Sequence, residues 1–164
     1  MMLQKQVDGI LLVPVKCRVE PIALIRSQGR PVVVVDRRIP GVPADMVCGD
    51  SEGGAYTLTR LLLALGHRHI AVLAGPRDVS TVEDRIQGYQ RALEHAGLEM
   101  ESDSIIYDDF HDDFSQESGY AMARELMRCE PRPTALFAVS NFIAFGALSY
   151  LRDAGIDVPE DVAM

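Results

Sequence analysis

The chain has 164 residues, of which 48% are apolar and 24% are charged, and this composition is typical of an ordinary globular protein. Its 16 basic and 24 acidic residues give a formal net charge of −8, which argues against a free-standing nucleic-acid-binding domain with a basic surface. No apolar run approaches the roughly 18 residues of a membrane span, and no signal peptide is recognisable, so we expect a cytoplasmic protein.

The first part of the chain alternates short apolar runs with helical patterns. The predicted elements are a strand at 7–14, a helix at 19–28, a strand at 31–36, an extended segment up to residue 47 and a helix at 54–65. The run PVVVVD at 31–36 is β-branched and uncharged until Asp36, as in a parallel strand buried on both faces. The last helix is predicted to bury one apolar side, consisting of Ala55, Leu58, Leu61, Leu62 and Leu65.

The chain is organised around residues 66–89, which read as a buried strand, a Gly-Pro turn and an amphipathic helix. The strand is predicted at 70–74, and the helix begins at Ser80, with Glu83 completing a capping-box pattern. Arg85 lies about 60° from the centre of the apolar stripe of this helix, given about 100° of rotation per residue. It is either a ligand contact near a strand end or a side chain that lays its stem on the core.

The last part continues the same alternation. The predicted elements are a strand at 104–107, a helix at 115–129, a strand at 135–139, a helix at 140–154 and the beginning of one more strand in DVAM. The helix at 140–154 has no charged residue before Arg152, so we expect most of it to be buried, with Gly146 in close contact with a neighbour. Strands and helices in this order predict a doubly wound parallel α/β architecture.

Sequence motifs give little support to catalysis or to metal and cofactor binding. No GxGxxG or P-loop pattern occurs, although the GPRDVST segment could accept an anion at the start of its helix. His67 and His69 have no third metal ligand nearby, and the three widely spaced cysteines, of which Cys17 is the first, are expected to be reduced. No catalytic set can be assigned, so we expect neither an enzyme nor a bound cofactor or metal.

The segment DDFHDDF at 108–114 contains four aspartates and ends in an aromatic residue. Its spacing is not that of an EF-hand, and a solvated acidic loop is the favoured interpretation over a calcium site. Phe114 follows a predicted strand, where an aromatic ring can stack on the face of a sugar. The alternative role of Phe114 is a hydrophobic staple before the next helix.

Taken together and in order, the apolar and turn motifs resemble the effector-binding domain of the LacI/GalR family of bacterial transcription regulators. The matching segments are VDGILLVP (7–14), PVVVVDR (31–37), GDSEGGAYTLTRLLLALGHRHIAVLAGP (49–76), EDRIQGYQRALEHAGL (83–98), SGYAMARELM (118–127), PRPTALFAVSNFIAFGAL (131–148) and GIDVPEDVAM (155–164). The resemblance implies a two-lobe fold of the periplasmic-binding-protein type. It assigns residues 1–66 to a partial first lobe and 67–164 to an incomplete second lobe, with the helix-turn-helix headpiece absent.

The same resemblance implies a function and a set of contact residues. A small sugar or related polyol is expected between the lobes, where it would change the affinity of a homodimer for operator DNA through the missing headpiece. The implied contacts are Arg85 to the effector's hydroxyl groups, Phe114 stacked on the effector, Thr81 and Asp36 as further polar contacts, and Ser140 and Asn141, which stand where the family usually has an Asn-Asp pair. The alternative function is a sugar-binding protein of a transport system.

Overall fold

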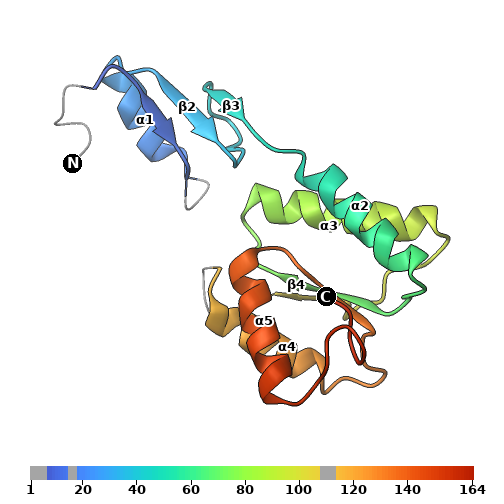
Figure 1. The fold of residues 1–164 in the computed structure, drawn as a ribbon. Helices are drawn as coiled ribbons and strands as arrows, with labels where there is room; N and C mark the ends of the chain where they lie inside the picture. Colours follow the sequence, from blue (N-terminus) through green and yellow to red (C-terminus); the bar gives the residue numbers. More distant parts are fainter. Residues whose placement is uncertain (1–6, 15–17, 108–113) are drawn as a thin grey trace. The chain divides into compact units, whose positions relative to one another are not determined.

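The computed structural model describes residues 7–14, 18–107 and 114–164, and it has the predicted α/β architecture with parallel sheets (Figure 1). Two compact units can be distinguished. The first contains the residues up to Asp50 together with Asp78–Thr81, and the second contains Ser51–Arg77 and Val82–Met164. Cys17 and the acidic positions 108–113 lie outside the described residues, so the expectations for them stay predictions.

The first unit is built on a small parallel sheet whose strands follow the order of the chain. The strands β1 (Ile10–Leu12), β2 (Val32–Val35) and β3 (Asp45–Val47) pair in the order β1-β2-β3, and α1 (Glu20–Ser27) connects the first two. The described core consists of Ile10, Ile22, Ile25, Val32, Val34, Ile39 and Val42. The run of valines in β2 fits its central position, because a strand paired on both sides suits β-branched side chains.

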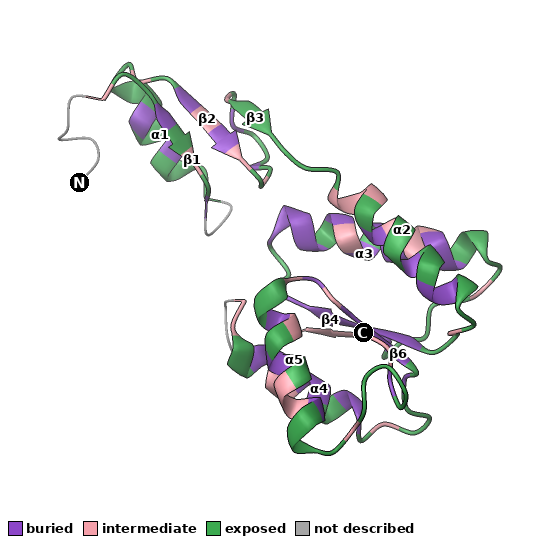
Figure 2. Cartoon of the chain, viewed as in Figure 1, coloured by how far each residue is buried: buried purple, intermediate pink, exposed green. Residues whose placement is uncertain are grey.

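The second unit contains a parallel sheet with β4 (Ile70–Ala74) at its centre. Its strand order is β5-β4-β6, with β5 at Ile105–Tyr107 and β6 at Ala135–Ala138. Every residue of β4 is buried, as the all-apolar sequence of this strand predicts (Figure 2). The three strands run in the same direction, so their carboxyl ends meet at one edge, which we call the carboxyl edge; the opposite one is the amino edge.

Helices cover both faces of this second sheet. Figure 1 shows α2 (Ser51–Ala64) and α3 (Ser80–His95) on one face, and α4 (Gln116–Leu126) and α5 (Asn141–Asp153) on the other. The α4–α5 contact depends on two glycines, as expected for Gly146. A Cβ atom on Gly146 would overlap the backbone of Gln116, and one on Gly119 would overlap the backbone of Ile143. The two helices therefore pack with their backbones unusually close together.

Two predictions about buried helix faces are wrong. In α2 the buried residues are Ala55, Thr59, Leu62 and Leu63, whereas Leu58, Leu61 and Leu65 are exposed. In α5 one face packs inward, but Phe142 and Phe145 are each 53% exposed and Leu148 is 40% exposed. Leucines surround most of α2, and α5 lacks charges on every side before Arg152, so neither sequence singles out one face.

The last predicted strand, in the DVAM segment, is represented in the structure by a single bridge. The carboxyl-terminal DVAM segment forms a single parallel bridge, between Ala163 and Ala135 of β6. The backbone N–H of Leu136 donates to the Ala163 carbonyl, and the N–H of Ala163 donates to the Thr134 carbonyl. The segment thus lies beside β6 in the expected parallel direction without extending into a named strand.

Candidate functional site

Arg85 connects helix α3 to the carboxyl edge of the second sheet. Its Nη1 atom donates a hydrogen bond of 2.7 Å to the carbonyl oxygen of Val139, the residue that follows β6. The side chain is half-buried, and among the described residues this is its one hydrogen bond and it has no ion pair. A guanidinium carries five N–H donors. A single neutral acceptor therefore fixes the group and leaves donors and a positive charge for a ligand.

Phe114 lies at the same edge, against the residue that follows β4. A Cβ atom added to Gly75 would overlap the Phe114 ring, so only a glycine at this position lets the ring approach the backbone so closely. Phe114 is half-buried and precedes Ser115, the N-cap of α4, whose hydroxyl accepts from the backbone N–H of Ser118 at 3.1 Å. The ring is thus positioned by both the strand end and the start of α4.

Ser140 and Asn141 follow β6 and begin helix α5. The Ser140 hydroxyl accepts a hydrogen bond of 3.3 Å from the N–H of Ile143, so part of its capacity is used to cap the helix. Asn141 is exposed, and its Oδ1 accepts from the adjacent N–H of Phe142 at 3.1 Å. The Asn141 amide NH₂ group has no protein acceptor in the part of the chain that the structure describes, and it can donate two hydrogen bonds to a ligand.

The structure therefore brings four of the six predicted contact residues to one edge: Arg85, Phe114, Ser140 and Asn141. The other two, Asp36 and Thr81, belong to the first unit. Asp36 follows β2, is exposed and has a φ of 75°, and its Oδ2 lies 3.8 Å from Nε of Arg37. Thr81 is buried in the first turn of α3. Whether these six residues bind a ligand stays a prediction.

Sequence reasoning missed one pair of residues at the carboxyl edge. The guanidinium carbon of Arg77 lies 3.5 Å from the centroid of the Tyr107 ring, which is a close cation–π contact. Tyr107 ends β5, and Arg77 is the third residue after β4. Both positions directly follow or end predicted strands, so the rule that ligands bind at the carboxyl ends of parallel strands could have identified them.

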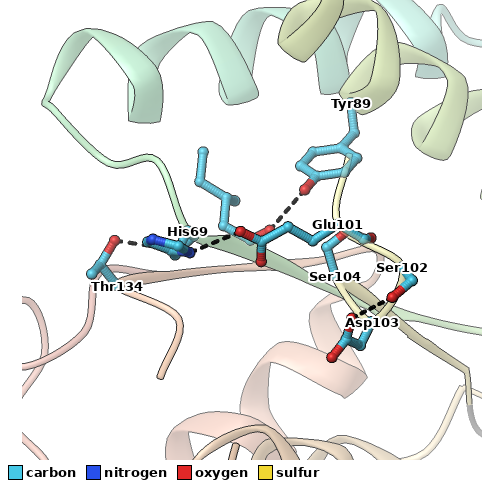
Figure 3. A network of polar contacts seen from close by, with 8 residues as sticks. His69, Tyr89, Glu101, Ser102, Asp103, Ser104 and Thr134 are labelled. Atoms are coloured by element: carbon cyan, nitrogen blue, oxygen red, sulfur yellow. Dashed lines mark hydrogen bonds and ion pairs between the residues drawn. The ribbon is translucent and has the colours of Figure 1, made fainter. Parts of the chain in front are cut away.

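The amino edge of the same sheet is occupied by polar contacts within the protein (Figure 3). Tyr89 of α3 donates to the carbonyl of Ile70 at 2.7 Å, and His69 Nδ1 lies 3.0 Å from Glu101 Oε1. His67 has a different partner, with its Nδ1 3.1 Å from the Thr134 hydroxyl. Burial raises the pKa of the Tyr89 phenol above its ordinary value, because the charged form would lose its hydration.

The described residues also bear on metal binding and on membrane insertion. Within them, no group of three or more His, Cys, Asp or Glu side chains could hold a metal ion. Cys48 and Cys129 are free thiols. Among the helices of these same residues, none combines the length and the apolar character needed to cross a membrane.

The chain matches a known protein family. The family model described as "Periplasmic binding proteins and sugar binding domain of LacI family" matches residues 1–164. The chain is 37% identical over 163 residues to the HTH-type transcriptional regulator CelR of Thermobifida fusca, covering 98% of this chain and 46% of that protein. It is 32% identical over 164 residues to the HTH-type transcriptional repressor PurR of Actinobacillus pleuropneumoniae, covering 100% of this chain and 48% of the repressor.

The solved structures agree with the sequence relatives. The structure of a transcriptional regulator CelR–cellobiose complex matches with a TM-score of 0.84 and 38% identity, covering 99% of this chain and 49% of that one. The chain thus spans about half the length of the curated relatives it matches. Because the family model matches every residue from 1 to 164, the chain belongs to the family of periplasmic binding proteins and sugar-binding domains of LacI-type regulators.

Proposed function

We propose that this chain is effector-binding sequence of a bacterial LacI-type transcriptional regulator and that its effector is a small sugar or a related polyol. The observation that carries the proposal is the convergence of Arg85, Phe114, Ser140 and Asn141 at the carboxyl edge of the β5-β4-β6 sheet. Open α/β sheets bind their ligands outside the carboxyl ends of the strands, so this edge is the expected place.

The chemistry of these residues suits a sugar. The Phe114 ring offers a flat apolar face against which the C–H face of a pyranose can pack. Arg85 and Asn141 offer N–H donors, and Ser140 offers a hydroxyl, so the ring hydroxyls of a sugar would find partners on several sides. A cellobiose complex of a CelR regulator is among the related structures, which supports a carbohydrate over other small molecules.

The regulatory mechanism follows from linkage. An effector that binds one conformation of the whole regulator more tightly than another shifts the population toward that conformation. If the two conformations differ in affinity for operator DNA, effector and DNA binding become coupled, by about 1–3 kcal/mol in typical cases. Operator binding would come from a helix-turn-helix part such as the one after which the relatives are named, and a homodimer would present two copies of it.

Two other functions have less support. A transport-linked sugar-binding protein would share the fold, but the curated relatives are named as transcriptional regulators. An enzyme would need a nucleophile with a neighbouring base, or an acid–base pair, at the carboxyl edge, and Arg85, Phe114, Ser140 and Asn141 form neither. Asp36 and Thr81 stay in the proposal as contacts contributed by the first unit, to be tested by their own variants.

The test is calorimetric titration of the chain with cellobiose, using wild type, Arg85→Ala and Arg91→Ala. Arg91 is the matched control, because it also lies on α3 but pairs with Glu52 and with the Tyr56 ring. Hydrogen bonds to charged groups contribute about 1.5–3 kcal/mol, so Arg85→Ala should weaken binding about 100-fold, since 1.4 kcal/mol corresponds to a tenfold change. Binding that Arg85→Ala leaves unchanged, or the absence of binding to wild type, would contradict the proposal.

A further inference from the structure

A second flat surface lies at the carboxyl edge, beside the predicted contacts. It is formed by the Arg77 guanidinium, whose carbon lies 3.5 Å from the Tyr107 ring centroid. Tyr107 is the last residue of β5 and pairs in register with Ala74, the last residue of β4. The Arg77–Tyr107 pair therefore stands over the end of β5, on the side of the sheet centre opposite to β6.

The positions of the contact residues along the carboxyl edge set the distance that a ligand must span. Arg85 binds the carbonyl of Val139, just beyond β6, and Phe114 packs on Gly75, just beyond β4. With the order β5-β4-β6 and neighbouring strands about 4.8 Å apart, the ends of β6 and β5 are separated by about 10 Å. A single pyranose ring covers roughly one strand spacing. A ligand held by Arg85 and Phe114 therefore needs a second ring to reach Arg77.

We propose that Arg77, held on Tyr107, is a specificity-determining residue that contacts the second ring of a two-ring sugar. This inference rests on the proposed function and adds the size of the effector to it. The guanidinium is planar and carries five N–H donors, so one face can stack on Tyr107 while some of the donors along its edge bind ring hydroxyls. A lysine could supply charge here but neither the stacked plane nor the fork of donors.

The tyrosine contributes by fixing the arginine before a ligand arrives. A free, exposed arginine loses about 1.5–2 kcal/mol of side-chain conformational entropy when it is immobilised. Stacking on Tyr107 restricts the side chain in the unliganded protein, so less of this cost falls on binding. Tyr107 is thus a positioning residue for Arg77, and its replacement should affect the same ligands in the same direction but less strongly.

The experiment compares cellobiose with glucose, its one-ring counterpart, in calorimetric titrations of the chain. The variants are Arg77→Ala, Arg77→Lys and Tyr107→Leu. The control is Arg60→Ala, because Arg60 also lies over a tyrosine ring, that of Tyr56, with 5.9 Å between its guanidinium carbon and the centroid, and it is on α2. Circular dichroism of each variant checks that the fold is retained.

Wild type and Arg60→Ala should bind cellobiose at least tenfold more tightly than glucose. Arg77→Ala should lose about tenfold in cellobiose affinity while its glucose affinity stays the same, and Arg77→Lys should not restore the difference. Two results would overturn the role of Arg77 alone. One is an equal loss of affinity for both sugars, and the other is unchanged cellobiose affinity in Arg77→Ala while Arg85→Ala still weakens it about 100-fold. A wild-type chain that binds neither sugar would overturn this inference together with the proposed function.

Discussion

The two edges of the β5-β4-β6 sheet are built from the same three strands, yet they hold polar groups in opposite ways. At the amino edge, polar side chains bind other parts of the protein, as Tyr89 binds the Ile70 carbonyl and His69 pairs with Glu101. At the carboxyl edge, Arg85 makes a single hydrogen bond within the described residues, to the backbone carbonyl of Val139. This bond fixes the Arg85 guanidinium and leaves it further N–H donors.

We therefore expect the amino edge of this sheet to contribute to the stability of the fold and the carboxyl edge to contribute to ligand binding. Removing the Tyr89 hydroxyl from the amino edge should cost folding free energy, because the buried Ile70 carbonyl is left without its hydrogen bond. Removing the Arg85 or Asn141 side chain from the carboxyl edge should cost ligand affinity and little stability. This distinction would be wrong if variants at both edges changed the free energy of unfolding and the ligand affinity in the same proportion.

The largest effect on stability is expected where α4 and α5 pack closely against each other. Gly146→Ala adds a Cβ that overlaps the Gln116 backbone, so we expect a loss of about 2 kcal/mol from overpacking. Gly54→Ala is the matched control, because an added Cβ meets nothing within 4 Å there and should stabilise α2 by about 0.5–1 kcal/mol. Urea denaturation measures both, and a Gly146→Ala chain as stable as wild type would show that the helices can move apart.

At the amino edge, Tyr89→Phe should cost about 1.5 kcal/mol at pH 7, because the Ile70 carbonyl loses a buried donor. The pKa of Tyr89 is raised by burial, so the unfolded chain ionises first as the pH rises above 10.0, the ordinary value for tyrosine. Wild type therefore loses stability above about pH 10 through this residue, and Tyr89→Phe does not. Urea denaturation between pH 7 and 11 should show that the difference in free energy of unfolding between wild type and Tyr89→Phe becomes smaller as the pH rises. A difference that stays constant over this range would contradict the prediction.

The smallest changes in stability are expected for two neighbouring residues at the carboxyl edge, Ser140 and Asn141. Ser140→Ala removes the N-cap of α5 and should cost about 1 kcal/mol of stability in addition to any loss of affinity. Asn141→Ala removes an exposed side chain that, within the described residues, accepts a hydrogen bond only from the next N–H, so stability should change by less than about 0.5 kcal/mol. Asn141→Ala is thus the clean test of ligand binding here. Sugar affinity equal to wild type would remove Asn141 from the site.

Most of the fold could be predicted from local patterns. The valine run of β2, the apolar β4 and the helix beginning at Ser80 all lie where the sequence indicates. The buried faces of α2 and α5 could not be predicted in the same way. Absence of charge does not identify a buried face when apolar residues lie on every side, and contacts such as Gly146 on Gln116 decide which face packs.

The same distinction between local patterns and long-range contacts applies to the candidate site. Phe114 could be identified from its place after a predicted strand, whereas Ser140 and Asn141 were implied by the family resemblance. The contact between Arg85 and Val139 depends on β6 lying next to β4, although β5 comes between them in the sequence. That strand order is a long-range property of the sheet, so a periodicity argument places Arg85 beside the core but cannot name its partner.

The backbone at Asp36 limits which side chains can occupy the position. Its φ of 75° lies in the left-handed region, where aspartate, asparagine and glycine are tolerated and other residues are strained. Aspartate, asparagine and glycine offer a charge, an amide and no side chain at the same backbone conformation. If Asp36 contacts the effector as proposed, Asp36→Asn and Asp36→Gly would change that contact and leave the turn intact.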